Sequence, residues 1–254
     1  MKNLVFLPIN IYQLNLVIDI GNTLLKIAVF KNNSLIVSIE FKDNFKSNIE
    51  GVLDKYPITH SILCNVSNSN EGLNYLLSIK TKQILFNESI KVPFTNSYST
   101  ISTFGKDRIA LVSAASKEFS NQNVLIIDLG SCITYDFKNS KNHYLGGSIS
   151  PGIHMRYKSL NDHTANLPLL NFKNITNFVG KSTEESIHSG VVNGVIQEVN
   201  GIISQYKNEF KEIRIILTGG DSKFLLKKIK NTIFAHSNFL LVGLNFLVES
   251  NKIK

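Results

Sequence analysis

Two acidic turns carry the residues best suited to chemistry in this chain of 254 residues. In each turn a run of apolar residues ends in an aspartate, and a glycine follows two positions later: Asp19 with Gly21, and Asp128 with Gly130. A glycine lets an anion approach the backbone N–H groups of a turn, but a carboxylate repels phosphate. The combination makes sense if a cation lies between the carboxylate and the phosphate oxygens. The turns therefore predict phosphate binding assisted by metal ions.

The sequence around the two turns repeats. Each turn joins an apolar strand pattern to a second strand, and a polar turn and a third strand follow, over residues 14–41 and 125–150. A single Asp-x-Gly is weak evidence, because aspartate and glycine are common turn residues. Two in the same context suggest a duplicated domain with a nucleotide held between its halves. Neighbouring side chains offer hydroxyl and ammonium groups to such a site: Thr23, Lys26 and Ser131.

A third loop could complete a nucleotide site. The strand predicted at residues 213–217 is followed by Thr218, Gly219, Gly220 and Asp221. Two bare glycines would let a flat base or ribose lie against the backbone. A plain turn is the alternative for any one of these loops, but the three together favour nucleotide binding. The Walker A and Gly-x-Gly-x-x-Gly patterns are absent from the sequence, which argues against P-loop and Rossmann proteins.

The sequence Gly105-Lys106-Asp107-Arg108 begins a predicted helix and offers an acid–base group. Asp107 could accept a hydroxyl proton, while the Arg108 guanidinium holds an anionic group in a forked contact. The alternative is a helix start at which an acidic residue is favourable to the helix dipole. Tyr98, on the long loop before this helix, could hydrogen-bond a polar substrate or simply pack.

Composition narrows the classes of protein to which this chain can belong. The chain is 43% hydrophobic and 18% charged, as an ordinary globular protein is. Its net charge of +8 comes almost entirely from scattered lysines, whereas specific DNA readers cluster arginine, so no nucleic acid partner is expected. The histidines show no metal-ligand spacing, and Cys64 and Cys132 are expected to be reduced thiols. Without a recognisable signal peptide or membrane span, the protein is expected to be cytoplasmic and not bound to a membrane.

Strands that alternate with helices indicate a layered α/β fold. The repeat predicts an N-terminal domain of residues 1–118 and a C-terminal domain of residues 119–254, joined by a helix at residues 105–119. The other predicted elements are helices at 45–56, 69–79 and 238–249 and strands at 61–66, 83–86 and 213–217.

A long helix is predicted to begin at a capping-box sequence, Ser182-Thr183-Glu184-Glu185. On this helix Ser186, Gly190 and Gly194 form a smooth ridge, against which either the chain itself or a second copy could pack. Before the helix, Gly146, Gly147, Pro151 and Gly152 predict a tight irregular corner.

Taken in order, these motifs resemble those of type III pantothenate kinases. The resemblance runs from about Leu14 to Val248, and its Gly-x-Asp-Arg element is specific to that family. The phosphate turns are shared with the whole acetate kinase/sugar kinase/Hsp70/actin superfamily. The motifs that carry it are Asp19 to Thr23, Gly105 to Arg108, Asp128 to Ser131, Gly146-Gly147 with Pro151-Gly152, Thr183, Thr218 to Asp221, and Gly243-Leu244-Asn245.

The resemblance implies two ribonuclease H-like domains of the actin-like ATPase type, with the nucleotide cleft between them. It implies phosphorylation of pantothenate to 4'-phosphopantothenate by ATP, the first step of coenzyme A synthesis. It also implies Mg²⁺, a monovalent cation such as K⁺ or NH₄⁺, and a homodimer whose substrate site takes residues from both subunits.

Residue roles follow from the same resemblance. Asp107 would be the catalytic base, Asp128 would bind the monovalent cation, and Asp19 would act on Mg²⁺ indirectly. The residues expected to bind ATP are Asp19, Ile20, Gly21, Asn22, Thr23, Leu24, Leu25, Lys26, Ser131, Gly219 and Gly220. The residues expected to bind pantothenate are Tyr98, Gly105, Lys106, Asp107, Arg108 and, from the partner subunit, Thr183.

Two other functions stay open on the sequence alone. The first is another small-molecule phosphotransferase of the superfamily, although most of these are longer. The second is a non-catalytic regulator of the same fold that binds nucleic acid through its basic surface. The presence of four charged residues argues against the regulator, because a site that no longer catalyses has no physical need for them: Asp19, Asp107, Arg108 and Asp128.

Overall fold

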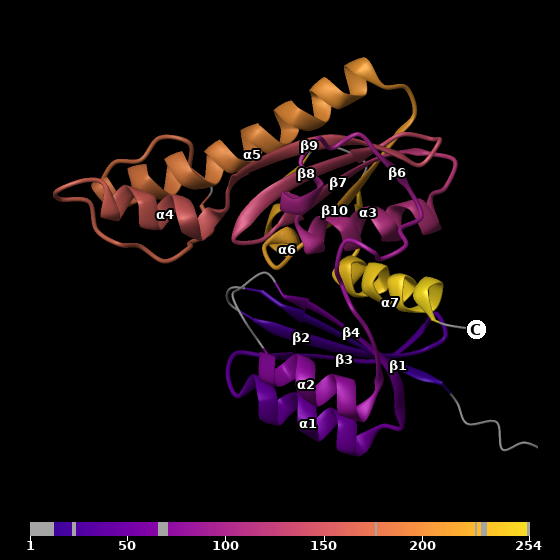
Figure 1. The fold of residues 1–254 in the computed structure, drawn as a ribbon. Helices are drawn as coiled ribbons and strands as arrows, with labels where there is room; N and C mark the ends of the chain where they lie inside the picture. The colour runs from indigo at the N-terminus through magenta and orange to yellow at the C-terminus, as the bar shows by residue number, and fades with distance from the viewer. Residues whose placement is uncertain are drawn as a thin grey trace, which may run out of the picture. The chain divides into compact units, whose positions relative to one another are not determined.

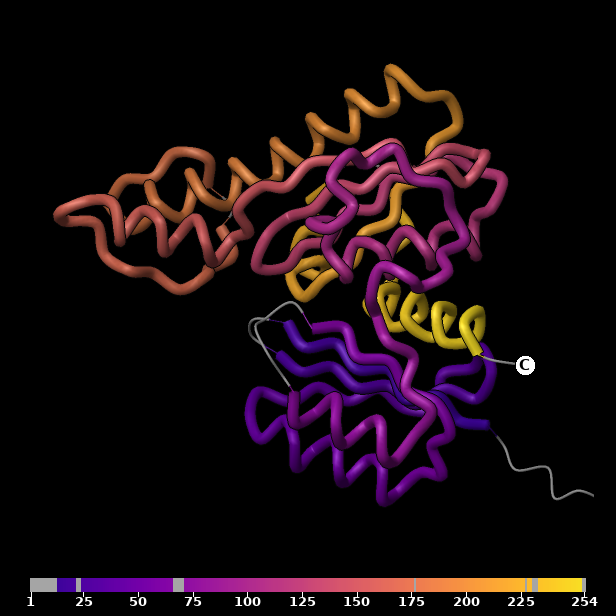
Figure 2. The backbone as a smooth tube through the Cα atoms, viewed as in Figure 1, coloured from indigo at the N-terminus to yellow at the C-terminus, as the bar shows by residue number. Residues whose placement is uncertain are grey.

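The computed structural model describes residues 13–21, 24–65, 71–175, 177–226, 228–229 and 233–252, and Figure 1 shows their secondary structure. The chain divides into two compact units, Met1–Lys91 with Leu244–Lys254, and Val92–Gly243. Each unit is a mixed α/β structure built on one sheet, and Figure 2 traces the backbone through both. No helix among the described residues combines the length and the hydrophobicity needed to cross a membrane.

The first unit holds a five-stranded sheet in the order β3-β2-β1-β4-β5. β1, β2 and β3 are antiparallel neighbours, while β4 and β5 run parallel to β1. Two helices, α1 and α2, share an apolar core with one face of this sheet. The bounds are β1 Leu14–Ile20, β2 Leu25–Lys31, β3 Ser34–Phe41, α1 Phe45–Lys55, β4 Ile58–Asn65, α2 Glu71–Lys80 and β5 Lys82–Ile84.

The second unit repeats this topology. Its six-stranded sheet has the order β11-β10-β7-β8-β9-β6, and from β9 to β11 the strands match β3 to β5 in order and direction. The duplicated ribonuclease H-like fold is therefore confirmed. The strands are β6 Thr95–Asn96, β7 Asn123–Leu129, β8 Cys132–Lys138, β9 His143–Pro151, β10 Ile213–Thr218 and β11 Phe234–Ala235.

Helices cover both faces of the second sheet. α5 packs on the face formed by Ile133, Tyr135 and Phe137 of β8, whereas α3 packs on the opposite face. The helical elements are η1 Ile101–Thr103, α3 Lys106–Glu118, α4 Ile153–Asp162, α5 Thr183–Glu209, α6 Ser222–Leu225 and α7 Phe239–Asn251.

The two units divide the chain differently from the expected boundary at residues 118 and 119. α3 belongs to the second unit, because Leu111 and Val112 share a core with Val124 of β7. The end of α7 belongs to the first unit, where Asn15 Nδ2 of β1 donates to Asn245 Oδ1 at 2.7 Å. An apolar helix packs on whichever sheet face is open to it, so chain order alone does not reveal its partner. The domains expected from the repeat stay a prediction.

The region around Gly146 differs from the predicted irregular corner. β9 continues through it to Pro151, with a register shift opposite Phe137 and Lys138. Gly146 takes a φ of 114°, and a Cβ on Gly147 would lie 1.7 Å from the Tyr135 carbonyl oxygen. The glycines therefore serve a bulge and a close strand approach instead of ending the strand.

Candidate active site

The first acidic turn joins β1 to β2. Gly21 N donates to Leu24 O at 3.0 Å, and Asp19 lies opposite Lys26 in the strand register. Asp19 is only 9% exposed, whereas Lys26 reaches the surface, with its Nζ 3.7 Å from Glu40 Oε1. Part of the Lys26 charge is therefore already compensated by Glu40. Asn22 and Thr23, both expected to bind ATP, lie outside the described residues.

The second acidic turn joins β7 to β8 and is tighter. Gly130 N donates to Cys132 O at 3.0 Å, and Asp128 lies opposite Thr134. Only Gly130 and Ser131 separate these strands, so the loop is shorter than its counterpart in the first unit. The exposed Ser131 is therefore placed beside the half-buried Asp128.

Two glycine loops close against this second turn. A Cβ on Gly219, whose φ is 92°, would lie 2.4 Å from both Asp128 Oδ1 and Leu129 O, and a Cβ on Gly152 would lie 2.2 Å from Gly130 O. Backbone hydrogen bonds seal both contacts, from Asp221 N to Leu129 O at 3.1 Å and from Gly152 N to Ser131 O at 3.0 Å. The structure thus brings together Asp128, Ser131 and Gly219, three of the residues expected from sequence.

The donors around Asp128 fit a hard cation. The Asp128 carboxylate and the Leu129 carbonyl oxygen both lie beside Gly219, and oxygen is the ligand that such cations take. The described residues contain no group of three or more His, Cys, Asp or Glu side chains that could hold a metal. An ion here would therefore complete its coordination with backbone oxygens, water or phosphate.

The first turn of α3 places Asp107. Its Oδ1 accepts a hydrogen bond from Arg108 N at 2.9 Å, and a Cβ on Gly105 would lie 2.5 Å from that same oxygen. Gly105 therefore leaves the space into which the half-buried carboxylate folds. The contact satisfies a backbone N–H at the helix start, as the structural alternative requires, and it also keeps the carboxylate in a defined orientation.

Arg108 is engaged inside the protein. The residue is 4% exposed, its Nε donates to Asp136 Oδ1 at 2.9 Å, and its Nη2 donates to the Tyr144 hydroxyl at 2.7 Å. Burial disfavours the Arg108 charge, but the neighbouring Asp136 outweighs this and raises the pKa of the guanidinium above its ordinary value. Its fork is thus already in contact with a carboxylate of the chain itself.

Tyr98 packs against the same arginine. Its ring stacks on Phe104 with centroids 5.1 Å apart, and the Arg108 guanidinium carbon lies 5.5 Å from each of the two ring centroids. The packing alternative for Tyr98 is therefore realised, and it brings this residue next to Arg108.

Sequence reasoning missed Asp136 and Tyr144. A signal for Asp136 was present, because Thr134, Asp136 and Lys138 alternate with the apolar Ile133, Tyr135 and Phe137 along β8. Polar residues at every second position usually indicate a solvated face. Here that face is buried under α3 and therefore needs internal partners.

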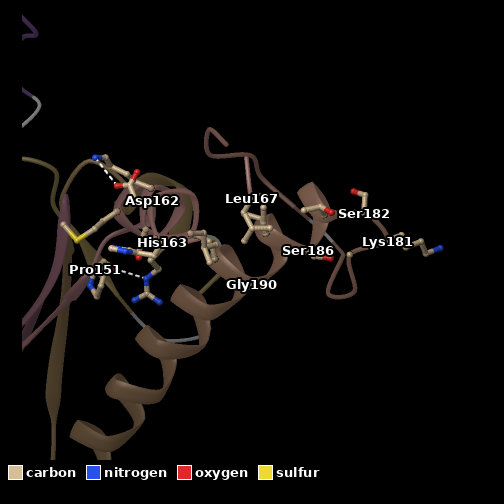
Figure 3. A pocket seen from close by; sticks show the side chains of 17 residues that line it. Pro151, Asp162, His163, Leu167, Lys181, Ser182, Ser186 and Gly190 are labelled. Atoms are coloured by element: carbon tan, nitrogen blue, oxygen red, sulfur yellow. Dashed lines mark hydrogen bonds and ion pairs between the residues drawn. The ribbon is translucent and has the colours of Figure 1, made fainter. Parts of the chain in front are cut away.

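Thr183 lies apart from Asp107 within the second unit. The predicted helix start is confirmed, since Ser182 Oγ accepts from Glu185 N at 3.2 Å and Thr183 begins α5, while the Glu185 carboxylate accepts from Lys181 N at 2.7 Å. Thr183 lines a cavity of about 1310 Å³ beside α4 and the first turns of α5, together with Ser182, Ser186 and Gly190 (Figure 3). Asp107 is on α3, which packs on the opposite face of the sheet from α5.

Solved structures with the same fold include proteins described as kinases. A Campylobacter jejuni protein described as a conserved candidate transcriptional activator of the Baf family is 22% identical, with 93% of this chain and 98% of that one covered at a TM-score of 0.58. A Listeria monocytogenes protein described as a candidate N-acetylmannosamine kinase is 12% identical, with coverages of 94% and 100% at a TM-score of 0.54. At these identities the likeness shows the fold alone.

Sequence comparison identifies the family. The profile of type III pantothenate kinases matches residues 15–205. A type III pantothenate kinase of Christiangramia forsetii is 49% identical over 94% of this chain and 99% of its own length, and that of Flavobacterium johnsoniae is 44% identical over 91% and 95%. With this agreement along nearly its whole length, the chain belongs to the type III pantothenate kinase family.

Proposed function

We propose that this chain, as a type III pantothenate kinase, transfers the γ-phosphoryl group of ATP to the primary hydroxyl of pantothenate, in the first step of coenzyme A synthesis. The match to the family over residues 15–205 is the observation that carries the proposal. The half-buried Asp107 at the start of α3 supports it, because this reaction needs a group that can receive the hydroxyl proton.

The acidic turns and the glycine loop bind ATP. Turns that contain glycine can bring backbone N–H groups close to phosphate oxygens, and the exposed Ser131 adds a hydroxyl at the second turn. At Gly220 an added Cβ would meet no atom of the described residues within 4 Å, which leaves bare backbone for a base or ribose. The proposed ATP-binding residues are Asp19, Ile20, Gly21, Asn22, Thr23, Leu24, Leu25, Lys26, Ser131, Gly219 and Gly220.

Two carboxylates hold the cations that the reaction uses. Asp128, with the Leu129 carbonyl oxygen beside the same glycine, would hold the monovalent cation (K⁺ or NH₄⁺), and Asp19 would act on Mg²⁺ indirectly. When bound, these ions supply positive charge that offsets the charge of the phosphates. The role of the chain is to fix the two carboxylates on the ends of buried strands.

In phosphoryl transfer the protein contributes mainly by positioning the reacting groups. Asp107 accepts the proton of the pantothenate hydroxyl as that oxygen bonds to the γ-phosphorus, and the bond from the γ-phosphorus to the bridging oxygen breaks to release ADP. Gly105 and Arg108 lie against this base, Lys106 precedes it on α3, and Tyr98 packs on Arg108; these four residues would contact pantothenate. Because the Arg108 charge is already balanced by Asp136, its contribution to substrate binding is orientation more than net charge.

The enzyme acts as a homodimer, with Thr183 reaching the pantothenate of the partner subunit. The ridge on α5 supports this, because a Cβ on Gly190 would meet no atom of the described residues within 4 Å. The described residues of one chain therefore leave the ridge uncovered at Gly190, whereas at Gly194 an added Cβ would lie 3.9 Å from Arg156 Nη1. The uncovered part is where a second α5 would pack. The separation of Thr183 and Asp107 on opposite faces of the sheet supports the same arrangement. A cytoplasmic location stays a prediction.

Release of ADP in the presence of pantothenate, with and without potassium, tests this function. We expect Asp107→Asn to retain ATP binding while its turnover falls about 10²- to 10⁴-fold, the usual loss for a general base. Coupled-assay kinetics and an ATP titration measure the two effects. Turnover near that of the wild type would remove Asp107 from its role.

The two rival functions give different results in the same experiments. Another small-molecule kinase would hydrolyse or transfer phosphate without any dependence on pantothenate. A nucleic-acid-binding regulator would show no turnover and would bind DNA with strong salt dependence.

A further inference from the structure

We propose that Asp136 and Tyr144 are positioning residues for this reaction, a role that rests on the proposed function. Asp136, in the middle of β8, and Tyr144, on β9, are both 0% exposed. Neither can contact pantothenate from such a place. They act on the substrate site through Arg108, which adjoins the base Asp107.

The three side chains form a closed triangle of hydrogen bonds. Asp136 Oδ1 accepts from Arg108 Nε at 2.9 Å and from the Tyr144 hydroxyl at 2.7 Å, and the same hydroxyl accepts from Arg108 Nη2 at 2.7 Å. Because hydrogen bonds hold the planar Arg108 guanidinium at two of its nitrogens, its orientation is fixed. The start of α3 is thereby pinned to the sheet.

Aromatic stacking extends this anchor to the substrate loop. Phe104 stacks on Tyr144, with centroids 4.8 Å apart and planes 12° from parallel, and on Tyr98 at 5.1 Å. Arg108 lies over the rings of Tyr98 and Phe104. Through these contacts one buried carboxylate sets the places of three proposed pantothenate-binding residues: Tyr98, Asp107 and Arg108.

Another residue of the same strand provides a matched structural control. Lys138, two positions after Asp136 on the same face, donates from Nζ to Phe119 O at 2.5 Å and Asn142 Oδ1 at 2.7 Å. It therefore holds the far end of α3, which ends at Glu118, away from Asp107. Both side chains are buried charges under one helix, but only Asp136 reaches the end that carries the site.

Steady-state kinetics of Asp136→Asn and Lys138→Met test the assignment. For Asp136→Asn we expect kcat to fall roughly 10- to 100-fold, the loss typical of a misplaced reacting group, with a raised KM for pantothenate. Its KM for ATP stays within about twofold, because the hydrogen-bond partners of Asp136 in the described part of the chain include none of the proposed ATP-binding residues. Lys138→Met lowers the melting temperature but keeps kcat and both KM values within about twofold of the wild type.

A double-mutant cycle shows whether Asp136 acts through Arg108. Once Arg108→Lys has removed the fork, adding Asp136→Asn should cost little more, so the two effects on kcat are not additive. Additive effects would overturn the assignment. So would an unchanged kcat and pantothenate KM in Asp136→Asn, or equal losses of kcat in Asp136→Asn and Lys138→Met.

Tyr144→Phe covers the case in which Asp136→Asn does not fold. This variant keeps the ring stacking and the ion pair and removes only the hydroxyl, so we expect a smaller fall in kcat in the same direction. Wild-type kinetics for Tyr144→Phe would then contradict the inference. A wild-type protein without pantothenate-dependent ADP release would contradict the proposed function and this role together, whereas an active wild type with unaffected variants would contradict this role alone.

Discussion

Gly219 makes a close backbone approach to the second acidic turn. An alanine there would place its Cβ 2.4 Å from Asp128 Oδ1 on a backbone whose φ of 92° disfavours any side chain. We expect Gly219→Ala to lower the free energy of unfolding by about 1–3 kcal/mol and to weaken ATP binding, because the loop or Asp128 must move. Urea unfolding and an ATP titration measure the two effects.

The neighbouring glycine is the control for this substitution. A Cβ on Gly220 would meet no atom of the described residues within 4 Å, so Gly220→Ala should leave the free energy of unfolding nearly unchanged. Equal destabilisation by both substitutions would mean that the contact with Asp128 is not the cause.

The buried Lys138 is expected to make the free energy of unfolding depend on pH. Burial lowers the pKa of this lysine to about 8 from its ordinary value of 10.5. Between these values the folded protein has released the proton and the unfolded chain still binds it, so unfolding takes up a proton and stability rises with pH. The free energy of unfolding of the wild type should therefore rise relative to that of Lys138→Met.

Urea unfolding of both proteins at about pH 7 and about pH 9.5 measures this difference. The comparison with the variant cancels the titration of the other groups. A constant difference between the two proteins across that range would contradict the burial of a titrating lysine.

Where a local motif defined a place in the chain, the sequence predicted which residues lie near one another, while their roles in binding stay predictions. Asp128, Ser131 and Gly219 come together as expected, because turns after parallel strands meet at one edge of a sheet. The partners of Arg108 could not be predicted. Asp136 and Tyr144 are 28 and 36 residues further along the chain, and only the packing of α3 on β8 brings them to the guanidinium.

At the scale of elements, the open ridge of α5 leads to a prediction about assembly. Gly190 is exposed on this helix, and an added side chain there meets no described atom of the chain itself within 4 Å. We therefore expect Gly190→Trp to keep the fold of the subunit but to shift the protein from dimer to monomer, because a large side chain blocks a close helix contact. Light scattering after size exclusion reports the oligomeric state, and circular dichroism reports the fold.

Two outcomes would contradict that prediction. A wild-type protein that is monomeric at micromolar concentration would remove the dimer. A fully dimeric Gly190→Trp would place the interface elsewhere. Gly201→Trp on the last turns of the same helix, where an added Cβ also meets no described atom within 4 Å, is the matched control.

Elements with a clear period or cap were predicted well. α1, α5 and β10 are found close to their expected bounds because amphipathic spacing, a capping box and a short apolar run are local signals. α4 was not predicted, since four glycine and proline residues nearby indicated a corner. β6 and β11 have two residues each, too few to show any alternation.

At the scale of the whole molecule, a mixture of two inactive variants tests whether the active site is shared between subunits. Asp107→Asn and Thr183→Ala should each be nearly inactive as homodimers. If Thr183 acts on the partner's pantothenate, a mixed dimer holds one site with both residues intact, so unfolding and refolding an equimolar mixture should restore about a quarter of the wild-type activity. An assay of ADP release before and after mixing measures this.

The control is a mixture in which both substitutions are carried by one chain and the partner is wild type. In every mixed dimer each site then contains one of the two substitutions, so activity should come only from wild-type homodimers. A failure of the first mixture to regain activity would place Thr183 in the site of its own chain or outside the site altogether.

The duplication was predictable because two similar acidic turns lie in similar strand contexts, and the sheets repeat one strand order. The unit to which α3 and the end of α7 belong was not predictable, because packing against a sheet leaves no mark in the repeat. The nucleotide cleft expected between the halves stays a prediction.

The discontinuous first unit has a consequence for synthesis on the ribosome. Its strands are made early, but the segment from Leu244 onward, which includes the Asn245 that binds Asn15, is made only after the whole of Val92–Gly243. At ordinary translation rates that delay is on the order of ten seconds. During that delay the Asn15 amide of β1 lacks its Asn245 partner, so the first unit is completed only when the last residues of the chain have been made.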